Sequence, residues 1–152
     1  MAKKKKKILV VDDEAPIREV VADMLREAGY AVATAENGEQ ALAILEKVTP
    51  DLICLDMSMP RMGGITFFKR ISSPVDGKVR IPIIVITGRA DLEPVFKDLD
   101  VVAFMTKPFE TETLIAKVHE VFSQEHIKTP SDIFPDQKDE DNTFTDDEHS
   151  AS

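Results

Sequence analysis

Along residues 7–124, short apolar runs alternate with longer segments in which apolar residues recur at helical spacing. The apolar runs occupy residues 8–11, 30–35, 52–55, 83–86 and 101–106. Each run has the length and composition of a buried strand. Apolar residues recur at helical spacing over 17–28, 38–48, 65–71 and 110–124, and more weakly over 91–98. Five strand–helix units in succession predict a parallel sheet with helices on both faces, an α/β fold.

The first helical segment shows how sharp this pattern is. Its expected inner stripe consists of Ile17, Val20, Val21, Met24, Leu25 and Ala28. Pro16 suits the first turn of a helix, and Gly29 suits its carboxyl-terminal cap. We therefore predict a helix that begins near Pro16, ends at Gly29 and buries this stripe.

Composition divides the chain into three parts. Periodicity is lost after Gln124, and the last 30 residues carry nine acids and two lysines, or −7 of the net charge of −9. We expect a basic arm over residues 1–6, one domain over 7–124 and an acidic, disordered tail over 125–152. No apolar run reaches the roughly 18 residues of a membrane span, and the arm lacks the apolar core of a signal peptide, so we expect a cytoplasmic protein.

Polar side chains stand where four of the five strands end. Asp12 and Asp13 follow the first strand, Asp56 the third, Thr87 the fourth and Lys107 the fifth. Parallel strands bring their carboxyl ends to one edge of the sheet, where ligands bind. Three carboxylates gathered there repel one another unless a cation joins them, and hard oxygen ligands suit Mg²⁺. A hydroxyl and an ammonium group beside them predict phosphoryl transfer onto a carboxylate.

Each of these residues also has a purely structural interpretation. Asp12 and Asp13 could cap the following helix, Thr87 could belong to a plain turn, and Lys107 could be a solvated surface lysine. All of these interpretations would have to hold independently, so the joint pattern favours a shared site. The single cysteine, Cys54, lies inside an apolar run and is interpreted as a small core residue.

Together the motifs resemble the receiver domain of two-component response regulators. The matching residues are Asp12-Asp13, Asp56 with Met57-x-Met59-Pro60-x-Met62-x-Gly64, Thr87-Gly88, and Lys107-Pro108-Phe109. The resemblance covers about residues 7–123. It implies a flavodoxin-like, three-layer fold with five parallel strands in the order 2-1-3-4-5.

The resemblance also implies a role for each matching residue. Asp56 would accept the phosphoryl group from a sensor histidine kinase or a histidine phosphotransfer protein. Asp13, Asp56 and the backbone carbonyl of Met57 would bind Mg²⁺ directly, and Asp12 would act through water. Lys107 and Thr87 would each contact a phosphoryl oxygen. A cis peptide bond would precede Pro108.

Three further positions and one departure follow from the same resemblance. Thr87 and Phe104 would form the conformational switch, and Ser58 and Arg89, two residues beyond Asp56 and Thr87, would set the lifetime of the phosphoaspartate. The segment between Thr87 and Lys107 is short and carries Pro94, so we expect a brief or displaced fourth helix.

These inferences predict a stand-alone response regulator rather than a metabolic enzyme. It would signal through protein contacts or pass phosphate along a relay to an unidentified target, without binding DNA or inserting into a membrane. A Mg²⁺-dependent aspartyl-phosphate phosphohydrolase is the main alternative, although Ser58 stands where such enzymes carry a second Asp. A nucleotide- or flavin-binding domain is a weaker one, because no glycine-rich loop follows the first strand.

Overall fold

The computed structural model describes residues 5–56, 64–76, 79, 81–88, 91, 94, 101–123 and 143–145. Its centre is a parallel sheet of five strands in the order β2-β1-β3-β4-β5. The strands are β1 (Lys7–Val11), β2 (Ala31–Ala35), β3 (Leu52–Asp56), β4 (Ile83–Thr87) and β5 (Ala103–Thr106). Every neighbouring pair is parallel, so the predicted flavodoxin-like topology is confirmed.

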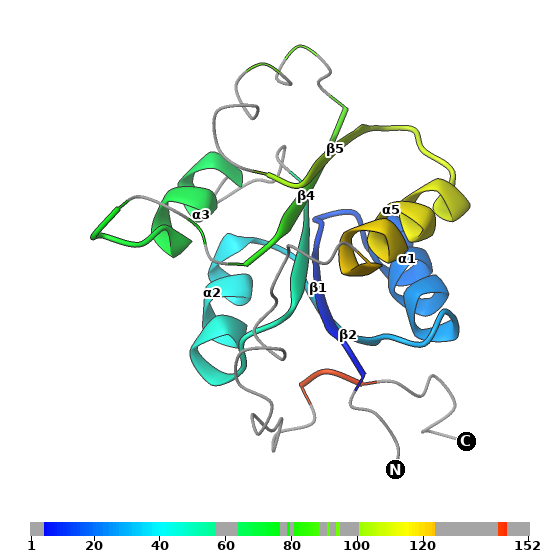
Figure 1. Cartoon of the computed structure of the whole chain (residues 1–152), viewed down its shortest axis with the longest axis horizontal. Coiled ribbons are helices and arrows are strands. Elements are labelled where there is room, and N and C mark those ends of the chain that lie inside the picture. Colours follow the sequence, from blue (N-terminus) through cyan, green and yellow to red (C-terminus); the bar gives the residue numbers. More distant parts are fainter. Residues whose placement is uncertain are drawn as a thin grey trace.

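Helices cover both faces of this sheet, as Figure 1 shows. The helices are α1 (Ala15–Glu27), α2 (Gly38–Lys47), α3 (Gly64–Ile71) and α5 (Thr111–Ser123). α2 and α3 lie together on one face, and α1 and α5 on the other. Two apolar clusters fill the layers between the sheet and the helices. Almost all side chains of the inner strands β1, β3 and β4 are buried in these clusters. Burial on both faces explains why these strands read as continuous apolar runs.

Local sequence signals set the helix ends. Pro16 lies in the first turn of α1, and Gly29 beyond its last turn has φ of +106°, a conformation that glycine adopts without strain. The side chain of Asn37 caps α2, because its Oδ1 accepts a hydrogen bond of 2.9 Å from the Gln40 backbone N–H. These caps fix where the chain turns back toward the sheet.

The structure corrects two details of the expected pattern. Val20 was placed on the buried stripe of α1, but it is 53% exposed, since that stripe is narrower and centres on Val21, Ala22 and Leu25. β5 begins at Ala103, two residues later than predicted. The expected short fourth helix over 91–98 falls mostly outside the described residues.

Both ends of the chain contribute to the domain. The Nζ of Lys6 lies 5.7 Å from the centroid of the Phe122 ring of α5. Thr143–Thr145 departs from the disorder expected of the tail, because Thr145 pairs with Val32 of β2 in an antiparallel bridge. Among the helices that the structure describes, none is long and apolar enough to cross a membrane.

Candidate functional site

The predicted polar residues meet at the carboxyl edge of the sheet. Asp56 is the last residue of β3 and only 1% exposed, while Thr87 ends β4 and is fully buried. The β3–β4 register pairs Asp56 with Ile86, which places Thr87 one residue further along the neighbouring strand. Asp12 follows β1, and Lys107 follows β5. The fold therefore delivers side chains from four strands to one edge, as predicted.

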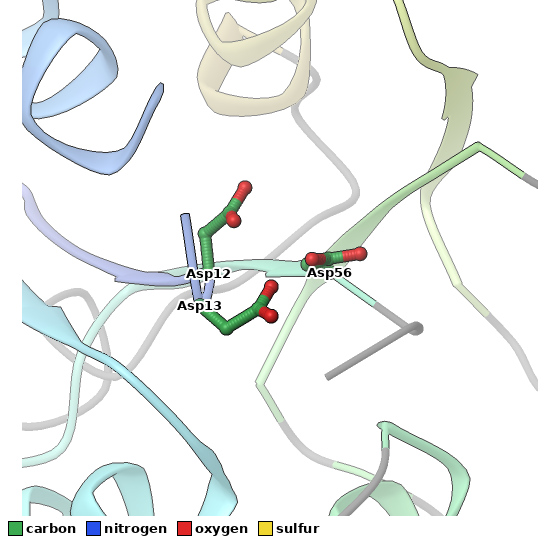
Figure 2. A group of neighbouring side chains, drawn as sticks. All are labelled: Asp12, Asp13 and Asp56. Atoms are coloured by element: carbon green, nitrogen blue, oxygen red, sulfur yellow. The ribbon is translucent and has the colours of Figure 1, made fainter. Parts of the chain in front are cut away.

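Three carboxylates converge at this edge. One oxygen from each of Asp12, Asp13 and Asp56 lies within 4.8 Å of the others (Figure 2). Asp12 and Asp56 are buried, whereas Asp13 is exposed, so the cluster is open to solvent on one side. Oxygen-only ligands at this spacing, with room for water, fit Mg²⁺, which prefers carboxylates and retains several waters. The donor set thus passes the chemical test for the predicted ion.

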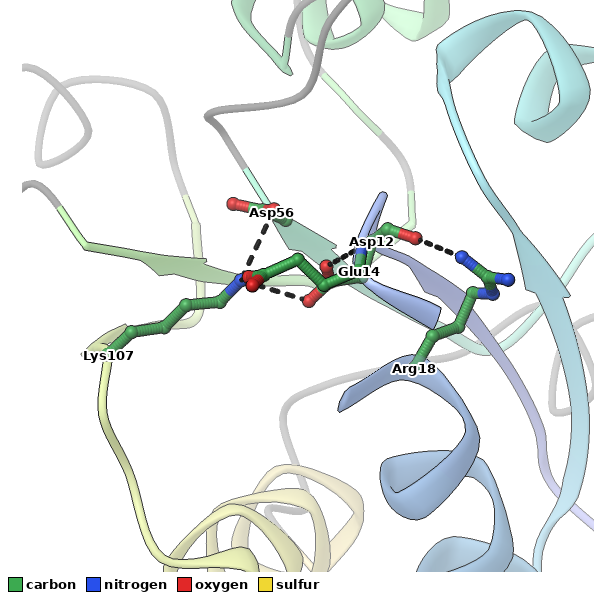
Figure 3. A network of polar contacts seen from close by, with 5 residues as sticks. All are labelled: Asp12, Glu14, Arg18, Asp56 and Lys107. Carbon is green, nitrogen blue, oxygen red and sulfur yellow. Dashed lines mark hydrogen bonds and ion pairs between the residues drawn. The ribbon is translucent and has the colours of Figure 1, made fainter. Parts of the chain in front are cut away.

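Lys107 is the cation of the site. Its Nζ lies 3.0 Å from Glu14 Oε1, 3.1 Å from Asp12 Oδ2 and 3.3 Å from Asp56 Oδ2, and its side chain is only 14% exposed (Figure 3). The Lys107–Pro108 peptide bond is cis, as expected. The Lys107 backbone N–H donates to the Thr87 carbonyl oxygen over 2.8 Å, which ties the lysine loop to the end of β4.

The charges of the site do not balance. Among the described residues, Lys107 pairs with three carboxylates, those of Asp12, Glu14 and Asp56, and Asp13 adds a fourth carboxylate beside Asp12 and Asp56. Burial raises the pKa of Asp12, and the Asp56 charge raises it further against the opposing effects of the Glu14 N–H and Lys107. Desolvation and the contact with Asp56 also raise the pKa of Asp13. Burial lowers the pKa of Lys107, but its contacts with the carboxylates outweigh this and raise it overall. A cation would relieve this excess of negative charge.

Two residues of the network were missed by sequence analysis. Glu14 forms the shortest ion pair of Lys107, and Arg18 donates from a guanidinium nitrogen to the Asp12 carbonyl oxygen over 2.8 Å. The Asp12 Oδ1 also accepts the Glu14 backbone N–H over 2.9 Å. Glu14 directly follows the Asp12-Asp13 pair, so the run of three acids was the available signal. Arg18 carries no comparable signal, because its partner is a backbone atom.

Of the other predicted positions, only Phe104 lies among the described residues. Phe104 lies on β5, is partly buried and packs against the apolar cluster on the α2–α3 face. Met57, Ser58 and Arg89 lie outside the described residues. Their assigned roles in metal binding and phosphate lifetime therefore stay predictions.

An apolar groove of about 580 Å³ borders the site. Residues from the start of α1 and from the loop between β5 and α5 line it, including Ile17, Val20, Lys107 and Phe109. The exposure of Val20 noted above is explained by this groove, which leaves one side of α1 uncovered. Lys107 lines the groove and also contacts Asp56, so the groove borders the carboxylate cluster.

Comparison with known proteins agrees with this geometry. The phosphate regulon transcriptional regulatory protein PhoB of Pseudomonas aeruginosa is 42% identical over 118 residues, which are 76% of this chain and 51% of PhoB. Sporulation initiation phosphotransferase F of Bacillus subtilis is 37% identical over 108 residues, 71% of this chain and 86% of that protein. The structure of the response regulator TrrA of Thermotoga maritima in complex with Mg²⁺-BeF has a TM-score of 0.66 and 35% identity, covering 76% of this chain and 97% of TrrA.

The chain spans about half the length of PhoB and of the other transcriptional regulators compared with it. The family model of the response regulator receiver domain matches residues 8–119. This range runs from β1 into α5 and contains every residue of the carboxylate cluster together with Lys107. The chain therefore belongs to the response regulator receiver domain family of two-component signalling systems.

Proposed function

We propose that this receiver acts as a stand-alone response regulator that accepts a phosphoryl group on Asp56. The observation that carries the proposal is the buried Asp56 carboxylate, with Lys107 at 3.3 Å and two further carboxylates within 4.8 Å. An Asp56 oxygen would attack the phosphorus of a phosphohistidine, and the P–N bond would break as the O–P bond forms. The electron pair of that bond returns to the imidazole nitrogen, and the product is an acyl phosphate on Asp56.

In this proposal Asp13, Asp56 and the Met57 carbonyl would hold Mg²⁺ directly, and Asp12 would hold it through water. The ion, when bound, neutralises the negative charge that gathers on the phosphoryl oxygens. Asp12 has a second task, because it keeps Lys107 directed at the site over 3.1 Å. The structure of TrrA in complex with Mg²⁺-BeF supports this role of the ion.

Lys107 and Thr87 then stabilise the phosphorylated state. The ammonium group of Lys107 would exchange its contact with the Asp56 carboxylate for one with a phosphoryl oxygen. The hydroxyl of Thr87 would donate to another oxygen, and its movement would make room for Phe104 to turn inward. Phe104 is only partly buried, which supports a side chain that can change rotamer.

The groove beside Lys107 supports a protein phosphodonor, either a sensor histidine kinase or a histidine phosphotransfer protein. A partner helix packed on Ile17 and Val20 would bring its histidine to the open side of the carboxylate cluster. The likeness to sporulation initiation phosphotransferase F over 86% of that protein supports a single-domain relay role.

Output would come through contacts with an unidentified protein target and not through DNA, and no metabolite substrate is expected. A cytoplasmic location belongs to the same proposal.

Phosphorylation by acetyl phosphate tests the proposal. With Mg²⁺, the protein should gain one acid-labile acyl phosphate that mass spectrometry assigns to Asp56, and Asp56→Asn should gain none. Repeated hydrolysis of an added phosphoester would instead support the phosphohydrolase. A phosphoryl group on another residue, or incorporation that survives in Asp56→Asn, would refute the assignment.

We also propose that Ser58 and Arg89 set the lifetime of this acyl phosphate, since they flank the expected path of the attacking water. Arg89→Ala should change the rate of phosphate release from the phosphorylated protein. Equal release rates in the variant and the unchanged protein would end this part of the proposal.

A further inference from the structure

The β2 edge of the sheet is occupied by a segment from the far end of the chain. Val32 donates its backbone N–H to the Thr145 carbonyl oxygen over 2.8 Å, and Thr145 donates its own to the Val32 carbonyl oxygen over 3.1 Å. This reciprocal pair is the hydrogen-bonding unit of an antiparallel ladder. Figure 1 shows the segment, coloured orange-red, close to the β2 end of the sheet. An otherwise parallel sheet thus gains a short antiparallel partner at its edge.

Arg26 reinforces this pairing from helix α1. Its Nε donates to the Thr145 carbonyl oxygen over 3.3 Å, and a terminal nitrogen donates to the Val32 carbonyl oxygen over 3.1 Å. The guanidinium therefore bridges both strands at the bonded pair. Its side chain is 18% exposed, so these hydrogen bonds form in a partly dehydrated place.

Phe144 anchors the segment in the core. It is 7% exposed and belongs to the apolar cluster that contains Ala31, Ala33 and Ala35 of β2. Because Thr145 pairs with Val32, the side chains of these two residues lie on one face of the sheet. The side chain of Phe144 lies on the other face, together with the three alanines of β2. Three small side chains on one strand leave a shallow surface that one large ring can cover.

We propose that the β2 edge is a docking site for an extended peptide with a phenylalanine anchor, and that Thr143–Thr145 occupies it as an intramolecular ligand. The recognition combines main-chain pairing with one side-chain pocket, the mode of strand addition to an open sheet edge. It also closes an edge strand that would otherwise expose unpaired backbone groups. The segment is the occupant because its two backbone bonds, its Arg26 bridge and its buried ring are all present in the structure.

The tether makes the segment a built-in competitor. About 20 residues connect α5 to Thr143, and a connection of that length gives an effective concentration on the order of 1 mM. A separate peptide of equal intrinsic affinity has to exceed this concentration to take its place. For an intrinsic dissociation constant of about 0.1 mM, the bound tail weakens the peptide's apparent affinity about tenfold.

Fluorescence polarisation with a labelled peptide of residues 141–148 tests this on the full chain. Phe144→Ala, which has lost its own anchor, should bind the peptide about tenfold more tightly than the unchanged protein. Phe134→Ala, an aromatic truncation elsewhere in the same acidic tail, should bind like the unchanged protein. A peptide with alanine in place of its phenylalanine should bind neither. Equal affinity of the Phe144→Ala and unchanged proteins for the peptide, or no binding to either, would overturn the proposal.

Hydrogen exchange at the Val32 amide provides a second test that needs no peptide. Thr145→Pro keeps Phe144 but removes the N–H that donates to the Val32 carbonyl oxygen. Loss of this bond should open the reciprocal pair, so that the Val32 N–H exchanges faster while the central β3 amides stay protected. Unchanged exchange at Val32 would contradict docking. Protection that disappears on dilution of the unchanged protein would assign the occupant to a second copy and overturn the intramolecular assignment.

Discussion

Replacing Asp13 with asparagine should make the metal-free protein more stable. Asp13 lies within 4.8 Å of the carboxylate oxygens of Asp12 and Asp56, and its pKa is raised by desolvation and by the contact with Asp56. Two unit charges 4.8 Å apart repel by about 1 kcal/mol in water and about 3.5 kcal/mol at an effective dielectric constant of 20. Asp13 is exposed and Lys107 offsets part of this repulsion, so we expect a gain near the lower value, about 1 kcal/mol.

Urea unfolding measures this gain. The chain contains no tryptophan and one tyrosine, so far-ultraviolet circular dichroism is the suitable signal. At pH 7 in EDTA, Asp13→Asn should raise the urea midpoint by about 0.5 M, for a denaturant slope of about 2 kcal/mol per molar. Glu19→Gln, an exposed carboxylate on the outer side of α1, is the matched control and should leave the midpoint nearly unchanged.

Mg²⁺ should reverse the order of the two proteins. At about one hundred times its dissociation constant, the ion should stabilise the unchanged protein by about 2.7 kcal/mol, and Asp13→Asn by much less. A variant that is less stable in EDTA, or that gains as much from Mg²⁺ as the unchanged protein, would refute the account of the carboxylate cluster.

The pH dependence follows from the same pKa shift. A carboxyl group whose pKa is raised in the folded state takes up its proton before the unfolded chain does, so stability rises as pH falls through that range. The stability gap between Asp13→Asn and the unchanged protein in EDTA should therefore narrow from pH 7 toward the pKa of Asp13. A gap that widens on acidification would show that the cluster is not the cause.

Three further predictions concern single residues. Lys107→Met should slow phosphorylation by acetyl phosphate roughly 10- to 100-fold, the value of one charged hydrogen bond, and an unchanged rate of mobility shift on a phosphate-affinity gel would exclude that role. Gly29→Ala should lower the free energy of unfolding by about 1–2 kcal/mol because of its left-handed φ of +106°. The matched control, Gly88→Ala, also faces open space and should cost less. Burial raises the pKa of Cys54 to about 12, so a thiol reagent at pH 8 should label it only after unfolding, and rapid labelling of the native protein would contradict the packing of β3.

Periodicity predicted the sheet well because its inner strands are buried on both faces. A short apolar run such as Ile53 to Leu55 is readily assigned to a buried strand, and right-handed crossovers place all strand ends at one edge. The strand order itself came from the resemblance to receiver domains. The error at Val20 has the opposite origin. The apolar stripe identifies the side of α1 that faces the protein. A groove along that side leaves Val20 exposed, and the sequence of α1 gives no sign of the groove. Whether an apolar side chain at the border of a stripe is covered depends on the neighbouring loop, which local periodicity does not encode.

The same distinction between topology and local packing applies to the residues of the site. Asp12, Asp56, Thr87 and Lys107 could be placed because the carboxyl ends of parallel strands must meet, whatever the intervening sequence. Glu14 and Arg18 lie beyond the strands, and their partners depend on side-chain reach rather than on topology.

The docking of Phe144 was harder to predict from the sequence. The neighbouring residues in the sequence are acidic and poor in apolar side chains, and such a composition usually predicts disorder. Three alanines on β2 and an arginine on α1 nevertheless create a place for one aromatic ring and one backbone pair. Average composition describes a segment by itself, whereas docking depends on what the folded domain leaves uncovered. An aromatic residue in a charged tail is therefore a reason to examine the open strand edges of the domain that carries it.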